Sequence, residues 1–434
     1  MFYETPAQKR ALILTSSAHF VTDGVSMVPL SIFPLLLTMF GLSAPELGVV
    51  AAMWNVTTVL GSPVVGHLSD RHKQNRALLV AGLVMMAAGI VGTGWSVTAG
   101  TVRSWLPLDL YPALVLFGAI GGFGSAVAHP IGGTVLSQAY PASKIGRALG
   151  LNGSMGSLGR TLYPTLVVIL ITALNLPHGV IALGLLGLLP AVLIGVLPLH
   201  SVRDKTSLGS AENPALNSPD PSDGQETRPQ NITSLSRSAK TSLAVLTTVG
   251  IVRGIFSQGV MSFLSVFIVQ VQQYSFSFGV GVIIMISLIL SVPGQLIFGH
   301  FSDLRRRGAL VVNNAGQSLA LIFYLYTLSN PVVATIFLAL FGFFSYSNYP
   351  VFISAVTDVV PADLLSLANS IVWGVGVLGG YAVGPIMVGL VAGSNLSILP
   401  TIFFALAVAS GLATALVALM PRRPRQPASD LRYP

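Results

Sequence analysis

Long apolar runs make up most of the chain, and short polar or basic segments separate them. A helix needs about 20 mostly apolar residues to cross the roughly 30 Å hydrocarbon core of a bilayer. Twelve runs in this chain are long enough, so the pattern predicts an all-α membrane protein with twelve transmembrane helices. We expect these helices at residues 11–39, 47–68, 77–97, 111–138, 147–172, 178–198, 242–270, 279–300, 309–328, 331–356, 366–391 and 398–420.

One long segment, residues 200–241, breaks this pattern. It is rich in Ser, Pro, Asn and Asp and has too few apolar residues to bury a core. We interpret it as a flexible cytoplasmic linker. It divides the chain into an N-terminal six-helix bundle at residues 1–199 and a C-terminal six-helix bundle with a basic cytoplasmic tail at residues 242–434.

The composition agrees with a membrane protein. Only 8% of the 434 residues are charged and 53% are hydrophobic, whereas soluble domains carry about 25% charged residues. The absence of cysteine excludes disulfides and thiolate metal sites. Lys9 and Arg10 precede the first apolar run as in a signal peptide. That run continues without a small-residue cleavage pattern, so we interpret it as a retained first helix.

Lysine and arginine predict the orientation. If both termini are cytoplasmic, the cytoplasmic segments carry 19 of the 22 Lys and Arg residues, and the outer loops carry only Arg103. The other two, Arg160 and Arg253, lie within predicted spans. The net charge of +8 therefore reflects topology and attraction to anionic lipid, not nucleic-acid binding. We expect a multi-pass monomer in the cell (inner) membrane.

The two halves of the chain repeat one another. GHLSD at 66–70 ends the second span and GHFSD at 299–303 ends the eighth, with an offset of 233 and basic residues after both. His19 and Arg253 occupy matching places in spans one and seven. Four further pairs share an offset of 220, namely Pro130 and Pro350, Pro141 and Pro361, Gly156 and Gly376, and Gly159 and Gly379. A duplication of six plus six spans is typical of secondary transporters.

The two repeated loops resemble the signature loop of the major facilitator superfamily, G-x-L-S-D-R followed by basic residues. The resemblance covers the whole chain and implies two bundles that rock around a central path. It also implies that Asp70 and Arg71 brace the second helix against the eleventh, and that Asp303 and Arg305 brace the eighth against the fifth. Gly66 and its repeat Gly299 are small enough to permit close helix approach. The alternative is a plain positive-inside turn with Asp–Arg pairs. We assign a gating role to Gly66, Asp70, Arg71, Gly299, Asp303 and Arg305.

Spans four and five carry a narrower resemblance. GGFGSAVAHP at 121–130 and IGRALGLNGSMGSLG at 145–159 are similar to the fosmidomycin-resistance branch of that superfamily, which implies export. Tyr163-Pro164 stands where the antiporter signature of drug exporters has Gly-Pro, so this motif by itself gives little support for antiport. The glycines of span five recur every three residues and predict close packing and bending of this helix.

Four ionisable side chains are predicted at a similar depth in the membrane. At a rise of 1.5 Å per residue, Asp23, Arg253 and Arg160 lie about 17–18 Å from the inner ends of spans one, seven and five, and His129 lies about 14 Å along span four. In the superfamily that the chain resembles, these helices line the central cavity. We therefore predict that the four side chains face one another.

Asp23 is the only carboxylate deep within a span, and His19 precedes it by one helical turn. Ionisable residues at this depth are costly and are functional by default. We predict that Asp23 takes up and releases a proton and that His19 tunes it. Two alternatives remain open: a static polar clasp between His19 and Asp23, or permanent neutralisation of Arg253 by Asp23.

The charges at this depth also predict the substrate class. Two arginines against one aspartate leave a net charge of +1 when both histidines are neutral. Because arginine keeps its proton, we expect an anionic substrate. Arg160 could instead bind helix carbonyls, and His129, which precedes Pro130, could hydrogen-bond a carbonyl freed by a kink. The candidate substrate-binding residues are Arg253, Arg160, His129, Gln258, Asn55, Tyr346 and Trp373, of which the uncharged ones are individually also explained by packing.

Other classes of function lack their motifs. The chain has no HExxH, no GxSxG and no phosphate-binding Gly-Lys-Ser/Thr loop, so we expect neither an enzyme nor an ATP-driven pump, and no cofactor or metal. A channel would need charge rings or a symmetric filter. We predict a proton-coupled secondary active transporter that exports a small anionic drug or metabolite by proton antiport. The alternative is a proton-coupled organic-anion symporter of monocarboxylate type, or an anion exchanger.

Overall fold

The computed structural model describes residues 5–72, 74–98, 108–197, 235–360 and 364–420. Most of these residues are helical, and there is no strand among them. Twelve of the described helical segments are long and apolar enough to span a membrane, so the predicted number is confirmed. The first is Pro6–Phe40 and the last is Leu396–Leu419, close to the predicted spans 11–39 and 398–420.

Several spans consist of two consecutive helices. The N-terminal half comprises α1 (Pro6–Val25), α2 (Met27–Phe40), α3 (Ala44–His72), α4 (Asn75–Ser96), α6 (Leu110–Ser125), α7 (Ala128–Ala139), α8 (Ala142–Leu174), α9 (Leu176–Leu186) and α10 (Leu189–Val196). The C-terminal half comprises α11 (Arg237–Val266), η3 (Phe267–Val271), α12 (Phe278–Ile289), α13 (Ser291–Leu304), α14 (Arg306–Tyr326), α15 (Pro331–Ser345), α16 (Asn348–Thr357), α17 (Leu365–Asn369), η5 (Ser370–Leu378), α18 (Gly379–Ala392), η6 (Leu396–Ile398), α19 (Leu399–Ala415) and η7 (Leu416–Leu419).

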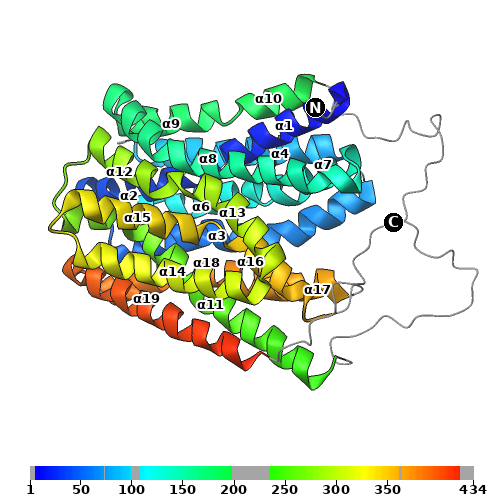
Figure 1. Cartoon of the computed structure of the whole chain (residues 1–434). Helices are drawn as coiled ribbons and strands as arrows, with labels where there is room; N and C mark the ends of the chain where they lie inside the picture. Colours follow the sequence, from blue (N-terminus) through cyan, green and yellow to red (C-terminus); the bar gives the residue numbers. More distant parts are fainter. Residues whose placement is uncertain (1–4, 73, 99–107, 198–234, 361–363, 421–434) are drawn as a thin grey trace, which may run out of the picture.

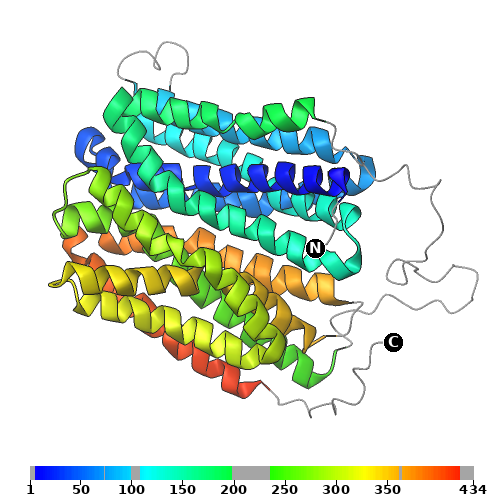
Figure 2. The same ribbon diagram turned by 45° about the horizontal axis from the view of Figure 1, so that its top comes forward.

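The two halves form two six-span bundles that lie side by side, with the helices of residues 6–196 in one and those of residues 237–419 in the other (Figures 1 and 2). Most of the predicted linker, residues 198–234, lies outside the described residues, as does the tail from residue 421. The part of the predicted linker from Arg237 to Thr241 is the first turn of α11.

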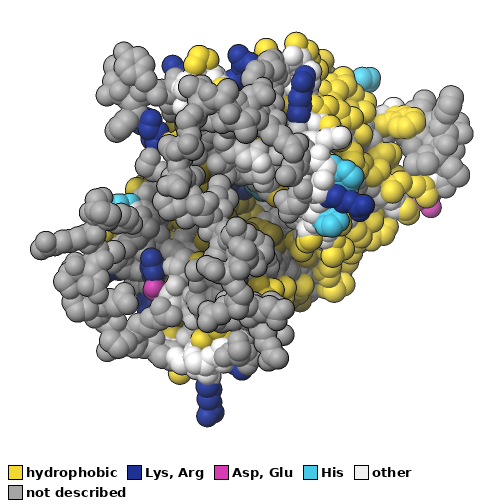
Figure 3. All heavy atoms as spheres, turned by 90° about the vertical axis from the view of Figure 1, so that its right-hand side faces the viewer, with side chains coloured by type: hydrophobic (Ala, Val, Ile, Leu, Met, Phe, Trp, Pro, Cys, Tyr) yellow, Lys and Arg dark blue, Asp and Glu magenta, His cyan; other side chains and the backbone are white. Residues whose placement is uncertain are grey.

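Basic side chains gather at one end of the molecule, which we call the basic end. Here α1, α8 and α11 begin and α3 and α13 end, on the right in Figures 1 and 2. Figure 3 looks onto this end and shows dark blue Lys and Arg side chains around its rim. The described basic residues at these helix ends are Lys9, Arg10, Arg71, Arg76, Lys144, Arg147, Arg237, Lys240, Arg305, Arg306 and Arg307.

Two breaks in the spans lie close to charged residues. The first span breaks at Ser26, three residues after Asp23, and Ser26 Oγ donates to the carbonyl of Asp23. The tenth span breaks at residues 346–347, between α15 and α16. A break inside the membrane leaves backbone groups that need partners from neighbouring helices. The breaks therefore attract polar side chains into the bundle interior.

Glycines bring the first helix of each bundle against the fifth helix of the same bundle. A Cβ added to Gly159 of α8 would lie 1.9 Å from the carbonyl oxygen of Phe20 in α1. In the other bundle, a Cβ on Gly380 of α18 would lie 2.4 Å from the carbonyl oxygen of Ile251 in α11. The duplicated glycine-rich segments therefore make equivalent contacts, as the internal repeat predicts.

The two bundles are in contact toward the end opposite the basic end. Ser265 Oγ, near the end of α11, donates to the carbonyl of Leu30 in α2. A Cβ on Gly48, at the start of α3, would lie 2.5 Å from the carbonyl oxygen of Pro385 in α18. These backbone approaches close the interface at this end.

Toward the basic end the interface is more open. Six described glycines would have no heavy atom within 4 Å of an added Cβ. Five of them lie toward the basic end, namely Gly66, Gly133, Gly195, Gly299 and Gly374, and one, Gly41, lies at the opposite end. The conformation is therefore closed at the opposite end and opens toward the basic end.

Candidate functional site

Three ionisable side chains surround the buried carboxylate of Asp23, and one of them, His129, is half exposed. Asp23 lies near the end of α1 and is 4% exposed. Its Oδ2 atom lies 3.2 Å from Nε2 of His19 and 3.1 Å from Nη2 of Arg160 in α8. Its Oδ1 atom lies 3.5 Å from Nε2 of His129 in α7. We call these four residues the Asp23 cluster.

A fifth residue, Asn152 of α8, sets which nitrogen of His19 carries hydrogen. Nδ1 of His19 lies 2.7 Å from Oδ1 of Asn152, and Nδ2 of the same amide lies 3.5 Å from Oγ of Ser16. An amide oxygen can only accept, so Nδ1 is the donor. Nε2 of a neutral His19 would then be an acceptor that faces the acceptor Oδ2 of Asp23. Both atoms are buried and without a hydrogen-bond partner among the described residues, so a hydrogen on the imidazole or on the carboxyl group would satisfy both.

Asn152 was not among the predicted site residues. Its signal in the sequence is an amide in the glycine-rich stretch of span five, ten residues after the start of the helix at Ala142. Asparagine in such a stretch is common enough that position by itself indicates little. The distance to His19 identifies its role.

Gly156 makes room for the cluster. A Cβ at this position would lie 2.4 Å from Oδ2 of Asp23 and 2.5 Å from Nε2 of His19. The glycine-rich α8 therefore lets α1 approach so closely that both side chains lie directly against its backbone. Sequence analysis predicted close packing for this glycine, and the structure adds that the packing forms part of the Asp23 cluster.

Arg160 connects the cluster to the second bundle. Its guanidinium carbon lies 4.5 Å from the centre of the Tyr346 ring, at the end of α15. A cation over an aromatic face is attracted by the ring quadrupole. Beside it, Nε2 of Gln295 in α13 donates to Oγ of Ser157 in α8, at 2.8 Å. The charge at the cluster therefore lies at the interface of the two bundles.

Arg253 does not join this cluster, and its predicted placement was wrong. The side chain is fully buried inside the C-terminal bundle, where Nη1 donates to Oδ1 of Asn314 at 2.5 Å and Nη2 donates to the carbonyl of Phe344 at 2.7 Å. The end of α15 leaves this carbonyl available. On the other side of α11, Gly254 lies against the backbone of Val377, which leaves no space for a long side chain there.

This difference changes the charge balance. The Asp23 cluster contains one arginine and one aspartate, so its formal charge is zero when both histidines are neutral. The predicted surplus of +1 depended on Arg253. It does not exist at the cluster.

A buried polar network in the C-terminal bundle was missed from the sequence. Nε2 of Gln317 donates to Ser257 at 2.6 Å and to Ser345 at 3.0 Å, and Nδ2 of Asn313 donates to the Phe344 carbonyl at 3.2 Å. The polar run NNAGQS at 313–318, within an otherwise apolar span, is the signal that could have revealed it. With Arg253, this network holds α11, α14 and α15 together.

Of the uncharged candidate substrate-binding residues, some lie at the interface of the two bundles and others pack within the C-terminal bundle. Nδ2 of Asn55 in α3 donates to the Tyr381 carbonyl of α18 at 3.3 Å, so this residue joins the two bundles. Gln258 is buried on α11. Trp373 packs edge-on against Tyr349, with ring centroids 4.8 Å apart, within the apolar cluster of the C-terminal bundle.

The predicted gating residues lie at the basic end. Arg71 and Arg305 are exposed, and the side chains of Asp70 and Asp303 lie outside the described part of the chain. Close approach at Gly66 and Gly299 is absent in this conformation. Their gating role therefore remains a prediction for a state in which this end closes.

One ion pair at the basic end was not predicted. Arg306, at the start of α14, pairs with Asp358, at the end of α16. This pair joins two helices of the same bundle. It strengthens the C-terminal bundle rather than the contact between bundles.

The Asp23 cluster also has donor atoms that a metal ion could use. The ligand atoms of His19, Asp23 and His129 all lie within 4.8 Å of one another. The cluster already contains a permanent cation, because Arg160 lies 3.1 Å from Asp23. A divalent ion there would be repelled by the guanidinium, so the arrangement is better suited to exchange of a proton.

Comparisons with known proteins agree with this architecture. The family model of the Major Facilitator Superfamily matches residues 15–379 and 280–432. The chain is 24% identical over 380 residues to the uncharacterized MFS-type transporter YfnC of Bacillus subtilis, covering 87% of this chain and 86% of that protein. It is 26% identical over 164 residues to the fosmidomycin resistance protein of Escherichia coli, covering 38% of this chain and 36% of that protein.

Solved transporter structures have the same fold. The nucleoside transporter NupG superposes with a TM-score of 0.71 at 12% identity, covering 96% of this chain and 100% of that one. A bacterial homologue of the human lysosomal transporter Spinster, in an inward-facing conformation, superposes with a TM-score of 0.70 at 14% identity, covering 96% and 97%. From the family match over most of its length and this shared fold, the chain belongs to the Major Facilitator Superfamily of membrane transporters.

Proposed function

We propose that this transporter is coupled to protons and that the Asp23 cluster carries the proton. The observation that supports this most directly is the 3.2 Å separation of Asp23 Oδ2 and His19 Nε2, with Asn152 at the other ring nitrogen. A proton added between these two buried atoms, which have no hydrogen-bond partner among the described residues, would satisfy both. Its gain or loss changes the charge of a buried site at the interface between bundles.

The second bundle senses this change through Arg160. An ionised Asp23 holds the guanidinium in a charge-assisted pair. A protonated Asp23 holds it less strongly, so Arg160, which already contacts Tyr346, becomes available to a substrate. Protonation therefore alters a contact between the two bundles that move in alternating access.

The orientation of this path follows from the positive-inside rule. We infer that the basic end faces the cytoplasm, in the inner membrane of the cell, with both termini on that side. The described conformation is then open toward the cytoplasm.

The charge balance of the cluster favours an organic anion that binds together with a proton. Arg160 is the one arginine of the cluster, and an ionised Asp23 already neutralises it. An anionic group gains full access to the guanidinium only after Asp23 takes up a proton. This argument favours proton–anion cotransport, because anion binding to an ionised cluster would need the second arginine that the structure places elsewhere.

Export by proton antiport is the second candidate. It is supported by two relatives whose names concern resistance: the fosmidomycin resistance protein and, at 28% identity over 142 residues, multidrug resistance protein 3 of Bacillus subtilis. In this mode, proton and substrate would compete for the cluster.

The experiment uses full-length protein in proteoliposomes with radiolabelled fosmidomycin as the first probe, followed by organic acids that stabilise the purified protein thermally. Proton coupling predicts that Asp23→Asn abolishes gradient-driven flux, while His178→Gln, at an exposed position at the start of α9, leaves it unchanged. If substrate accumulates inside when protons flow inward, the protein is a cotransporter. If substrate leaves when protons flow inward, it is an antiporter. Gradient-driven flux in Asp23→Asn equal to that of the unmodified protein would contradict the proposed coupling.

A further inference from the structure

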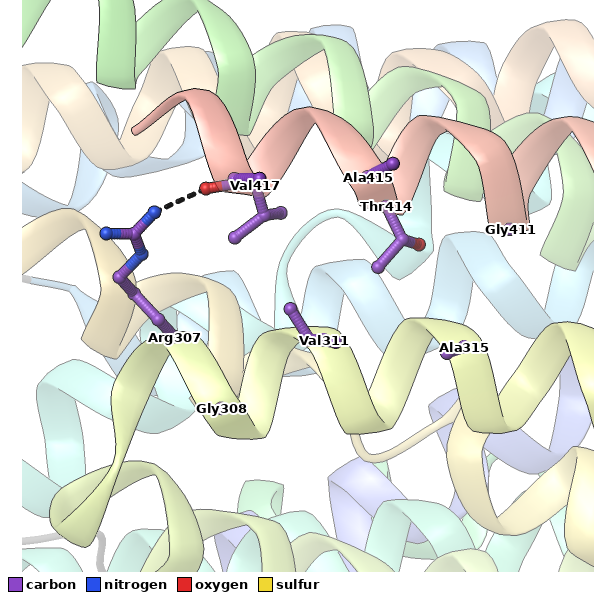
Figure 4. A pocket seen from close by; sticks show the side chains of 9 residues that line it. Arg307, Gly308, Val311, Ala315, Gly411, Thr414, Ala415 and Val417 are labelled. Atoms are coloured by element: carbon purple, nitrogen blue, oxygen red, sulfur yellow. Dashed lines mark hydrogen bonds between the residues drawn. The ribbon is translucent and has the colours of Figure 1, made fainter. Parts of the chain in front are cut away.

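An open groove lies on the outer surface of the C-terminal bundle, away from the Asp23 cluster. It has a volume of about 580 Å³ and runs between α14 and the helical segment α19–η7 (Figure 4). Its lining residues are Arg307, Gly308, Val311, Ala315, Gly411, Thr414, Ala415, Val417 and Ala418. Apart from Arg307 and Thr414, the lining residues are apolar or are glycines.

Small residues form the floor of the groove. Gly308 and Ala315 on one helix, and Gly411 and Ala418 on the other, are each seven residues apart. At a rise of 1.5 Å per residue, the groove is about 10 Å long. One leaflet of a bilayer has roughly 15 Å of hydrocarbon. The groove therefore extends through much of the leaflet at the basic end.

The surface around the groove is apolar and faces outward. Val311 is 39% exposed, Leu412 is 69% exposed and Leu419 is 64% exposed. An exposed apolar face on the outside of a transmembrane bundle contacts acyl chains. The groove itself suits a single chain, because its glycine and alanine residues leave a recess between two helices.

Arg307 gives the groove a charged end. It is the first residue of the lining along α14, at the basic end, and its Nη2 atom donates to the carbonyl of Val417 across the mouth of the groove (Figure 4). This bond holds the guanidinium over the recess. The exposed Arg305 lies two residues before it, so two arginines lie at this end of the groove.

We propose that the groove binds one anionic glycerophospholipid of the leaflet at the basic end. The phosphate group is recognised by Arg307, and one acyl chain lies along the small residues between α14 and α19. Basic recesses between transmembrane helices at this depth are suited to anionic head groups. A lipid held there would join the last span to the rest of its bundle.

The test is native mass spectrometry of the purified full chain with an equal mixture of phosphatidylglycerol and phosphatidylcholine that carry the same acyl chains. We expect phosphatidylglycerol to be retained at about five-fold higher occupancy than phosphatidylcholine, the preference that one arginine supplies. Arg307→Gln should remove the preference, and the matched control Arg237→Gln, at the exposed start of α11, should retain it.

A second variant changes the groove but leaves the hydrogen bond of Arg307 intact. Ala415→Leu fills the recess while the bond to Val417 remains, and it should lower the occupancy of both lipids. Equal retention of the two lipids, or equal effects of Arg307→Gln and Arg237→Gln, would overturn the proposal. Full displacement of phosphatidylglycerol by millimolar inorganic phosphate would overturn it as well, because the acyl chain would then contribute nothing. A lipid-free dimer that dissociates on the Ala415→Leu change would also overturn the proposal, because a second copy of the chain would then occupy the groove.

Discussion

Arg160 of the first bundle lies over the ring of Tyr346 of the second bundle, 4.5 Å from its centre. The same guanidinium lies 3.1 Å from the Asp23 carboxylate. One side chain therefore contacts both the proposed proton site and the opposite bundle. A change of charge at Asp23 can reach the interface through Arg160 alone.

This arrangement predicts distinct effects of conservative and radical changes at Arg160. Arg160→Gln should abolish proton-coupled flux, because neither Asp23 nor the Tyr346 ring keeps a cationic partner. Arg160→Lys keeps a charge and should retain part of the flux, with weaker substrate affinity because lysine lacks the planar fork. Flux and half-saturation in proteoliposomes measure both. Normal transport in Arg160→Gln would remove this residue from the mechanism.

Asn152 should act on the pH profile of transport. In Asn152→Ala, a neutral His19 can place its hydrogen on Nε2 and donate to Asp23, so the site no longer requires an added proton; the midpoint of the profile should move to lower pH. In Asn152→Asp, a second carboxylate stabilises the cationic imidazole, and the midpoint should move to higher pH. Initial flux between pH 5 and 9 measures this. A lower rate with the same midpoint in both variants would indicate a purely structural role.

A methyl group at position 156 should disrupt the Asp23 cluster. In Gly156→Ala, the added carbon would overlap Asp23 and His19, so the two side chains must move. Such overpacking costs about 1–3 kcal/mol. We expect loss of proton coupling with a moderate decrease in thermal stability. Gly133→Ala is the matched control, because a Cβ at this glycine meets open space. Identical behaviour of the two variants would contradict this assignment.

Arg253 should matter for stability rather than for substrate binding. Arg253→Gln removes two hydrogen bonds from a fully buried cation, each worth about 1.5–3 kcal/mol. Asn314→Ala should destabilise the C-terminal bundle for the same reason. Thermal unfolding in detergent measures the loss. The folded fraction of Arg253→Gln should bind substrate with unchanged affinity. If this variant instead lost substrate affinity without losing stability, Arg253 would belong to the anion site, as the sequence predicted.

The number and positions of the membrane spans could be predicted from the sequence because they depend on properties that sum along the chain. Apolar run length determines which segments can span the bilayer, and all twelve predicted spans overlap a helix of the structure. The repeated GHLSD and GHFSD loops indicated two equivalent bundles, which the structure confirms. The glycines of span five indicated close packing, which Gly156 and Gly159 make against α1.

The direction in which each buried side chain points was decided only by the tertiary structure. Helical rise predicts depth, and the structure brings Asp23, Arg160 and His129 together. The rotation of each helix about its axis follows from its packing, however. Arg253 turns toward the free carbonyl of Phe344, because the opposite side of α11 lies directly against the backbone of α18. The pattern of hydrophobic residues along the chain contains no information about the packing of α18 against α11. The sequence therefore predicted which charged residues lie within the spans, and the packing of the helices decided which of these side chains meet.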